Sequence, residues 1–586
     1  MLTNAPAPPL TADWNVARRV SDYAARDPDR LAIAVQLARP TASGDNFATM
    51  SFAELDADSN LLADGLLASG VKPGMRLALL VPPGLDFISL VFALLKAGVV
   101  IVLIDPGMGR RNLVRCLSEA EPEGFVGIPL VQAIRAFLWR RFPRAKFNFT
   151  VGRRWIWDRG TPLAALRARS LRADFCPAIA QADDPAAIIF TTGSTGPPKG
   201  VLYRHGNFTR QAEEIRDFFG IAPGEIDLSC FPLFALFNAA MGATTVIPHM
   251  DATRPAKADP RRIVAAVQEL RATQAFASPA LWNVVGRYCE QHQITLPSLR
   301  RVLSAGAPVP PHVLRRMKGA IAPEGDVHTP YGATEALPVA SIAASEVLAE
   351  TAAKSAAGAG TCVGRRFPGI EWKVIRITDG PIATLAEAEE LSAGEIGELI
   401  VRGPVVTTEY VTRTDCNPLH KIQDGETFWH RMGDVGYLES VVGQASCQPN
   451  ESGRRDPCPS AERFWFCGRK SHRVITAAGT LFTIPCEAIF NQHPRIYRSA
   501  LVGVGPPGQQ RPVIFAEPWP EHRASSKADE QALLGELREL AEQHPHTSQI
   551  QDFFLMNSLP VDIRHNAKIF REKLAVVAAQ RLRVPS

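Results

Sequence analysis

The chain has 586 residues, of which 46% are hydrophobic and 21% are charged, and its formal net charge is +5. This composition is typical of folded globular domains and excludes a disordered chain. So small a charge over this length excludes a strongly electropositive nucleic-acid binder, but it leaves small anionic ligands open. The length corresponds to roughly three to four domain equivalents.

The 10 cysteines are scattered, without a CxxC pair at zinc-binding spacing. This usage predicts a reduced protein of the cytoplasm. The first residues, MLTNAPAPPLTADWN, lack a basic stretch followed by an apolar run, so we expect no secretory signal there. The most apolar stretch, residues 87–104, is interrupted by Lys96 and Gly98. It therefore predicts a helix, a turn and a buried strand, and we expect no membrane span.

Helical and strand-like segments alternate from Trp14 onward. LADGLLASGV predicts a helix that ends at Gly70, and RLALLVPP, VVIVLIDP and AAIIF predict buried strands. Helices that alternate with continuous apolar strands indicate an α/β fold with a parallel sheet covered on both faces. Residues 352–360, 440–463 and 523–529 are polar or rich in small residues, and we expect loops or insertions there.

The segment 134–157 interleaves arginines and a lysine with seven aromatic residues. Two interpretations remain open. The segment is either a basic aromatic surface for a membrane or a partner protein, or a solvated helix followed by an ordinary strand with its aromatic side chains in the core. We favour the second, because runs of charge are usually solvated faces.

A loop rich in glycine and hydroxyl groups, TTGSTGPPKG, directly follows the strand AAIIF. Such a loop points several backbone N–H groups at phosphate oxygens, and Lys199 adds a positive charge. A Walker A loop is excluded, because Pro198 precedes the lysine and Gly200 occupies the place of the Ser or Thr that binds magnesium. The sequence therefore predicts a phosphate site of another type.

The segment TTGSTGPPKGVLYRH resembles the signature loop of the adenylate-forming enzymes, which include acyl-CoA synthetases, luciferases and peptide-synthetase adenylation domains. Later blocks follow in the family's order. The resemblance implies a large N-terminal domain over residues 1–467, a hinge at 468–471 and a small mobile α+β domain over 472–586, with ATP and Mg²⁺ bound. The phosphate-binding residues that it implies are Thr191, Thr192, Gly193, Ser194, Thr195, Gly196 and Lys199.

Further blocks carry the other roles that the family implies. SAGAP at 304–308 resembles the segment whose backbone flanks adenine, and YGATE at 331–335 resembles the block that stacks on the base and reaches the α-phosphate and Mg²⁺. RMGDVGYL and CGRKSH resemble the blocks that bind the ribose. The residues implied are Gly306, Ala307 and Pro308, then Tyr331, Gly332, Thr334 and Glu335 (the Mg²⁺ ligand), and finally Asp434 and Arg469 for the ribose.

The C-terminal segment VDIRHNAKIFREKL places Lys568 where the family has its catalytic lysine. By resemblance, this lysine brings the substrate carboxylate to the α-phosphate. Ala567 and Asp562 stand where the family usually has Gly and Pro, which is a departure from the pattern. The alternative is a solvated lysine at the start of a basic helix.

The segment FPLFALFNAAMG differs from the PLFH block of many acyl-CoA synthetases, because Ala235 stands in place of the histidine. Its apolar side chains suit an alkyl chain, or else form a plain core helix; they are Phe234, Leu236, Phe237 and Met241. Together with HTPYGATEALPVASI and VDIRHNAKIFREKL, this segment resembles most the β-lactone synthetases of bacterial long-chain olefin biosynthesis.

This closer resemblance implies a long-chain 2-alkyl-3-hydroxyalkanoic acid as the substrate. It also implies a β-lactone decarboxylase and a 2-alkyl-3-oxoalkanoate reductase as partner enzymes. His205 and His328 lie beside matching blocks and are candidates for the base that takes the hydroxyl proton. Two alternatives stay open, namely a fatty acyl-CoA synthetase and a nucleotide-binding scaffold that has lost catalysis.

Overall fold

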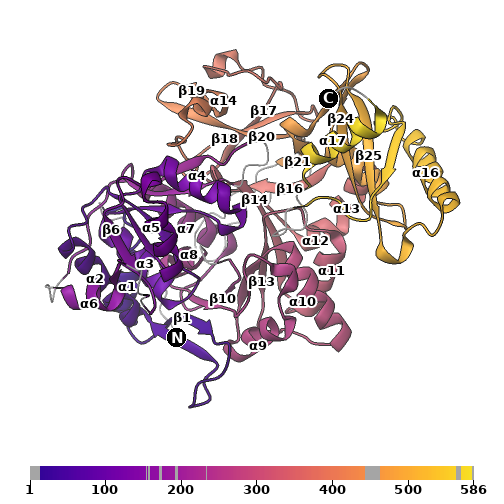
Figure 1. Ribbon diagram of the computed structural model, residues 1–586. Helices are drawn as coiled ribbons and strands as arrows, with labels where there is room; N and C mark the ends of the chain where they lie inside the picture. Colours follow the sequence, from indigo (N-terminus) through magenta and orange to yellow (C-terminus); the bar gives the residue numbers. More distant parts are fainter. Residues whose placement is uncertain are drawn as a thin grey trace.

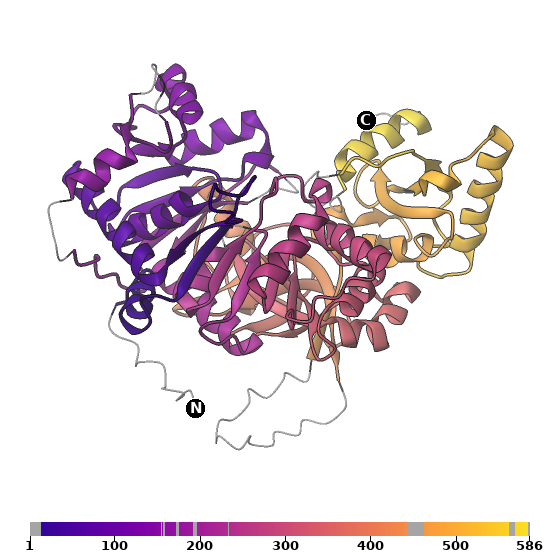
Figure 2. The same cartoon turned by 90° about the horizontal axis from the view of Figure 1, so that it is seen from below.

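The computed structural model describes residues 13–153, 155, 159–170, 175–191, 196–231, 234–441, 462–561 and 569–583. Most of the chain forms one large body, and the C-terminal part, drawn in yellow, forms a small unit at its side (Figures 1 and 2). The α/β architecture that the alternating segments predict is confirmed. None of the described helices is long and apolar enough to cross a bilayer.

The first sheet of the large body has seven strands, and all neighbours are parallel except the last pair. Its central strands are short runs of apolar residues, as buried parallel strands require. The order is β7 (Thr161–Pro162), β6 (Phe147–Thr150), β5 (Gly124–Gly127), β3 (Arg76–Leu80), β4 (Val100–Leu103), β8 (Pro185–Phe190) and β9 (Gly200–Arg204).

The second sheet has fourteen strands and joins a parallel half to an antiparallel half. The parallel strands are β1 (Leu31–Gln36), β11 (Thr244–Ile247), β10 (Ile226–Ser229), β12 (Gln274–Ala277), β13 (Arg301–Ser304) and β14 (Asp326–Ala333), with β2 (Phe47–Ser51) antiparallel at the edge. The antiparallel strands are β15 (Ala336–Ala343), β16 (Thr361–Arg366), β21 (Glu462–Arg469), β20 (Thr427–Ser440), β18 (Gly397–Arg402) and β17 (Glu371–Ile375), with β19 (Lys421–Asp424) paired to β20.

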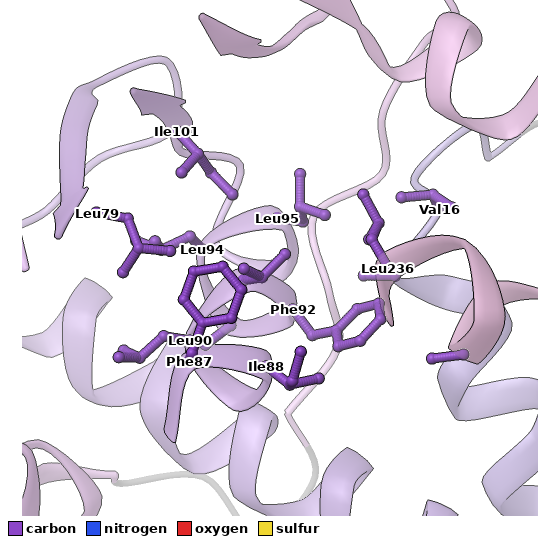
Figure 3. Packing of buried hydrophobic residues seen from close by; sticks show 14 of the residues in the cluster. Val16, Leu79, Phe87, Ile88, Leu90, Phe92, Leu94, Leu95, Ile101 and Leu236 are labelled. Atoms are coloured by element: carbon purple, nitrogen blue, oxygen red, sulfur yellow. The ribbon is translucent and has the colours of Figure 1, made fainter. Parts of the chain in front are cut away.

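Helices cover the sheets, and one of them is buried on every side. Ten consecutive residues at the C-terminal end of α3 (Leu85–Lys96) are buried, and Figure 3 shows Phe87, Phe92 and Leu95 within the surrounding core. The other helices of the large body are α1 (Arg18–Arg26), α2 (Phe52–Ala68), α4 (Arg110–Ala120), α5 (Pro129–Phe137), α6 (Leu163–Arg169), α7 (His205–Phe219), α8 (Phe234–Met241), α9 (Pro260–Leu270), α10 (Pro279–His292), α11 (Pro311–Ala320), α12 (Ala344–Glu346), α13 (Ala352–Lys354) and α14 (Asn417–His420).

The small unit follows β21 and a single 3-10 turn over Lys470–His472. It has a three-stranded sheet and a separate hairpin, which helices cover. The strands are β22 (Val474–Thr476), β23 (Gly479–Leu481), β24 (Ile496–Val504), β25 (Arg511–Pro518) and β26 (Asp552–Leu555), and the helices are α15 (Thr483–Phe490), α16 (Lys527–Glu542) and α17 (Arg571–Leu582).

The helix, turn and strand expected over residues 87–104 are confirmed as α3 and β4. The helix that ends before Gly70 is confirmed as α2, and Gly70 has a φ of +91°. The loop expected at residues 352–360 is wrong. This stretch is α13 and a π-helical turn (Ser355–Ala359), and Gln492 of the small unit donates a hydrogen bond to the Ala356 carbonyl there.

Of the other two expected loops, the one at 440–463 is mostly untested, and the one at 523–529 is shorter than expected. Residues 442–461, most of the expected insertion at 440–463, lie outside the described residues. Residues 523–526 are irregular, and α16 begins at Lys527.

Candidate active site

The phosphate loop spans the turn between β8 and β9. Its two ends are fixed to each other, because the Thr191 and Lys199 backbones are joined by an N–H···O bond of 3.0 Å, and Thr191 Oγ1 accepts from Lys199 N at 3.2 Å. A Cβ added at Gly196 would meet no atom within 4 Å. The tip, residues 192–195 with Thr192, Gly193, Ser194 and Thr195, lies outside the described residues, so their phosphate role stays a prediction.

Lys199 lies in a cluster with His420 and Tyr410, two residues that no sequence motif predicted. Its Nζ lies 2.9 Å from Nε2 of His420, at the end of α14, and 4.4 Å from the centroid of the Tyr410 ring. Burial lowers the pKa of Lys199, and the charge of Glu335 opposes that change. Among the described residues, the ammonium is therefore held by a ring nitrogen and a ring face and makes no direct ion pair.

Glu335 lies at the turn between β14 and β15, within hydrogen-bond reach of the same cluster. The Tyr410 hydroxyl donates to Glu335 Oε1 at 2.6 Å. Thr407 fixes the backbone there, since its N–H and its hydroxyl both donate to the Glu335 carbonyl, at 2.9 and 3.0 Å. The adjacent Thr334 carbonyl accepts from the Tyr203 hydroxyl at 2.6 Å. The turn that carries Thr334 and Glu335 is thus held by hydrogen bonds from Tyr410, Thr407 and Tyr203.

Asp434 and Arg469 meet because they are paired residues on neighbouring antiparallel strands, β20 and β21. Arg469 Nη1 lies 3.0 Å from Asp434 Oδ1, and the Tyr331 hydroxyl donates to Asp434 Oδ2 at 2.5 Å. The charge of Asp434 raises the pKa of Arg469, whereas burial raises the pKa of Asp434 against the pull of that guanidinium. Three sequence blocks, represented by Tyr331, Asp434 and Arg469, thus converge.

One carboxylate oxygen of Asp434 has room for a further hydrogen-bond donor. Asp434 is buried, and its Oδ1 makes no well-aligned hydrogen bond with the described residues, although Arg469 is near. A buried carboxylate oxygen without a donor is costly unless a ligand supplies one. Two vicinal hydroxyls, such as those of a ribose, supply such donors, so this residue fits the nucleotide that the sequence predicts.

The segment that is expected to flank the base follows the strand next to β14, which carries Tyr331. Strand β13 pairs with β14, with Leu303 opposite His328, and Gly306, Ala307 and Pro308 follow at the carboxyl end of β13. Gly306 has a φ of +94°, which suits glycine. A Cβ at Gly332 would lie 2.6 Å from the Ala336 carbonyl oxygen, so the β14–β15 turn also needs glycine. Ligands commonly bind at such carboxyl ends of parallel strands.

The apolar residues of α8 divide into two groups. Leu236, Phe237 and Met241 are buried in the core with α3 and α7, and Figure 3 shows Leu236 against Phe92. Burial fits a place in the core and also a place in the wall of a closed pocket, so the pocket role expected for these three stays a prediction. The Phe234 ring stacks on the Phe276 ring, with the two ring centroids 3.8 Å apart.

Two histidines, His205 and His328, are the sequence candidates for the base. His205 begins α7 at the far end of the β8–β9 hairpin, where its N–H donates to the Asp184 carbonyl. It is buried, and burial lowers its pKa to about 4. The β8–β9 hairpin separates His205 from the phosphate loop, and the role of His205 as the base stays a prediction. The other candidate, His328, packs edge-on against Phe219 with the ring centroids 5.2 Å apart. Lys568 lies outside the described residues.

Among the described residues, no three His, Cys, Asp or Glu side chains gather as a metal site. This arrangement fits Mg²⁺ nevertheless, because that ion usually binds one or two carboxylates together with substrate phosphates and waters. Glu335 is a carboxylate at the correct end of the sheet, beside Lys199. The residues present would thus hold the ion through Glu335 once a nucleotide supplied the other oxygens.

Sequence reasoning missed Tyr410, His420 and Lys421. Burial lowers the pKa of Lys421 to about 7, and its Nζ donates to the Thr407 carbonyl. Burial and the Lys199 charge lower the pKa of His420 to about 3. A lone tyrosine and a His-Lys pair without a repeated spacing carry no motif. The only available signal was that they stand between the GELIVRGP and RMGD blocks.

The comparisons with known proteins agree with this geometry. Residues 20–411 match the family model described as AMP-binding enzyme. The olefin β-lactone synthetases of Xanthomonas campestris pv. campestris and Stenotrophomonas maltophilia are 44% and 43% identical to this chain over 581 and 575 residues. Each alignment covers 97% of this chain and 98% of the relative.

More distant relatives have a lower sequence identity to this chain. A long-chain-fatty-acid–CoA ligase of Mycobacterium tuberculosis is 27% identical over 403 residues, 67% of this chain and 71% of its own. The structure of o-succinylbenzoate coenzyme A synthetase from Bacillus subtilis, in complex with ATP and magnesium ion, is 20% identical, with a TM-score of 0.70 over 95% of this chain and 98% of that chain. This last likeness shows a common fold.

Proposed function

The chain belongs to the family of AMP-binding enzymes and, within it, to the olefin β-lactone synthetases, and on this premise we propose that it uses ATP to convert a long-chain 2-alkyl-3-hydroxyalkanoic acid into a β-lactone. The observation that carries the proposal is the 44% identity over nearly the whole of both chains. The convergence of Lys199, Glu335, Asp434 and Arg469 on one end of the sheets supports it.

In the first half-reaction, a carboxylate oxygen of the acid attacks the α-phosphorus of ATP. The bond from that phosphorus to the bridging oxygen breaks, pyrophosphate leaves with that oxygen, and an acyl-adenylate remains. We assign the ribose hydroxyls to Asp434 and Arg469, the base to Tyr331 and the segment 306–308, and the phosphates to the loop 191–196 with Lys199. Bound Mg²⁺ would neutralise phosphate charge beside Glu335.

Two further residues act on the same phosphorus. Thr334 presents its hydroxyl to the α-phosphate. Lys568 brings the anionic carboxylate to the anionic phosphate, where their charges would otherwise repel. The cations Lys199 and Lys568 would therefore stabilise charge that is largest when the phosphorus is attacked.

In the second half-reaction, the 3-hydroxyl oxygen attacks the acyl carbonyl carbon of the same molecule. A new C–O bond closes the four-membered ring, the bond from the carbonyl carbon to the phosphate oxygen breaks, AMP leaves, and the hydroxyl proton passes to solvent or a base. Since nucleophile and electrophile belong to one molecule, the effective concentration is high and no second acceptor is needed. Phe234 and Phe276 are the aromatic surface that we assign to an alkyl chain.

The test is an assay without coenzyme A. The purified chain is incubated with ATP, Mg²⁺ and a racemic 2-alkyl-3-hydroxy acid, while AMP is followed by chromatography and the lactone by its infrared carbonyl band. We expect AMP and β-lactone in equal amounts. AMP release that requires coenzyme A would instead establish the alternative, a fatty acyl-CoA synthetase, which Ala235 in the place of the usual histidine argues against.

The proposal extends to the setting of the enzyme. Residues 1–467 would form the ATP- and substrate-binding domain, 468–471 the hinge and 472–586 the domain that carries Lys568. The dispersed cysteines favour the cytoplasm. A β-lactone decarboxylase would consume the product, and a 2-alkyl-3-oxoalkanoate reductase would supply the hydroxy acid.

A further inference from the structure

Helix α5 buries a polar side chain and exposes several apolar ones. The side chain of Gln132 is fully buried, and its amide donates to the Phe125 and Phe149 carbonyls of β5 and β6, at 3.2 and 2.8 Å. Leu130, Ile134 and Phe137 lie at helical spacing on the opposite side. They are 50%, 46% and 86% exposed.

A tryptophan extends this apolar surface. Trp139, 61% exposed, follows the helix directly, and the Arg140 guanidinium lies 5.4 Å from its ring centroid. The expectation that the aromatic residues of segment 134–157 lie in the core holds for Phe142 and Phe149 and is wrong for Phe137, Trp139 and Trp155. Single exposed apolar residues need no explanation, but four within 10 consecutive residues do.

The rim of this surface is positively charged. Arg140 and Arg141 are exposed, and neither pairs with a carboxylate within the part of the chain that the structure describes. Together with Arg144 they line a cavity of about 320 Å³, whose lining also includes Glu121. Arg144 itself is paired with Glu121 and Glu123. Within the described residues, the Arg140 and Arg141 guanidinium groups thus have no carboxylate partner that would compete with an external anion.

We propose that this surface, Leu130, Ile134, Phe137 and Trp139 with Arg140 and Arg141, binds peripherally to a bilayer that carries anionic headgroups. We call it the α5 patch. A short helix with an apolar face, a tryptophan at its end and arginines at its rim combines the features of interfacial membrane anchors. The aromatic and aliphatic groups enter the headgroup region, while Arg140 and Arg141 contact lipid phosphates.

The use of such docking rests on the proposed function. An acid with two long alkyl chains resides in a membrane rather than in water, so an enzyme held at the bilayer surface meets its substrate there. The patch itself does not depend on that activity. The test is therefore a binding measurement, which separates failure of this inference from failure of the proposed function.

Flotation of the full chain with vesicles is the test. Vesicles of phosphatidylcholine alone are compared with vesicles that also contain phosphatidylglycerol. We expect binding to the anionic vesicles that weakens as salt is added. Arg140→Glu/Arg141→Glu should weaken it by roughly thirtyfold or more, and Phe137→Ser/Trp139→Ser by roughly tenfold or more.

Two matched controls separate the patch from general charge and hydrophobicity. Arg287→Glu/Arg315→Glu makes the same charge change on exposed arginines of α10 and α11, and Val576→Ser removes an apolar side chain that is 58% exposed on α17. Both controls should bind vesicles as the wild type does. Thermal unfolding confirms that each variant is folded.

Three outcomes would overturn the proposal. The first is no binding to anionic vesicles. The second is binding that the patch variants leave unchanged or that the controls reduce equally. The third is a wild-type oligomer, detected by light scattering, that Phe137→Ser/Trp139→Ser dissociates without any change in vesicle binding, because the patch would then be an interface between copies of the chain.

Discussion

Lys199 Nζ lies 2.9 Å from His420 Nε2, and the two residues are 221 positions apart in the chain. With its pKa lowered to about 3, His420 is neutral at physiological pH and accepts from the lysine ammonium. This contact holds Lys199 within electrostatic reach of Glu335. We therefore regard His420, which the sequence analysis did not single out, as a positioning residue for Lys199 of the phosphate loop.

We expect His420→Leu to raise the KM for ATP by about tenfold or more, because a hydrogen bond to a charged group contributes about 1.5–3 kcal/mol. His420→Gln should restore most of the affinity, since its amide oxygen also accepts. Pyrophosphate exchange at varied ATP measures both. A role in folding alone is indicated if the two variants lose activity equally with KM unchanged.

Stability should fall in mild acid. Burial lowers the pKa of His205 and His328 to about 4 and that of His420 to about 3, and it also lowers the pKa of His430 well below its usual value. Between about pH 6.5 and pH 4 the unfolded chain binds protons that the folded chain does not. Each such histidine therefore removes about 1.4 kcal/mol of unfolding free energy per pH unit.

Urea unfolding at a series of pH values measures this slope. His205→Gln should make the slope shallower by about 1.4 kcal/mol per pH unit, which is the contribution of one histidine. Gln291→Ala, at an exposed position without a titratable group, should leave the slope unchanged. A stability that is constant over this range would contradict the buried neutral state of these side chains.

Asp434→Asn should weaken ATP binding by roughly tenfold to a hundredfold, because a neutral amide replaces a carboxylate that accepts from the ribose. The matched control is Asp424→Asn, which removes the carboxylate paired with Arg402 at 2.9 Å, outside the site. Calorimetric titration with ATP gives both affinities. Equal losses in the two variants would remove the ribose role from Asp434.

Lys568→Ala should abolish formation of the acyl-adenylate and leave most of the ATP affinity in place, because this lysine acts on the reacting phosphorus. Lys573→Ala is the matched control, since this lysine lies on α17 over the Phe570 ring, at 4.7 Å from its centroid. Exchange of labelled pyrophosphate into ATP reports the step. Normal exchange by Lys568→Ala would leave that residue without its proposed role.

The sequence is most informative where one local feature decides the outcome. Lys96 and Gly98 mark the end of α3 and the turn before β4, and the positive φ of Gly70 and Gly306 follows from the residue type. The sequence blocks that contain Tyr331, Asp434 and Arg469 also predicted a shared site, and the structure joins these residues directly.

Long-range packing explains what the sequence could not show. Leu236 and Phe237 have the same apolar character in a pocket wall as in a core, and only their neighbours distinguish the two. His420 becomes significant only when α14 folds against the phosphate loop. The alanine-rich stretch at 352–360 is helical because it packs on α15 and Gln492, which no local signal reports.

The contact between Gln492 and the Ala356 carbonyl joins the small unit to the large body and allows a test of the hinge. Lactone closure admits no bulky acceptor, so we expect one orientation of the small domain to serve both half-reactions. Ala356→Cys/Gln492→Cys, joined by a short bismaleimide, fixes that orientation. Serine first replaces three native cysteines, so that no thiol competes at those positions. They are the exposed Cys176, and Cys447 and Cys458.

The prediction is that cross-linking changes pyrophosphate exchange and lactone yield by the same factor, whatever that factor is. The two rates are measured on the same cross-linked sample, and the single-cysteine variants treated with the reagent are the control. Exchange that persists while acyl-adenylate accumulates without lactone would show that the second half-reaction needs a rotation of the small domain. The ratio of the two rates decides the question, because a cross-link that merely damages the site lowers both.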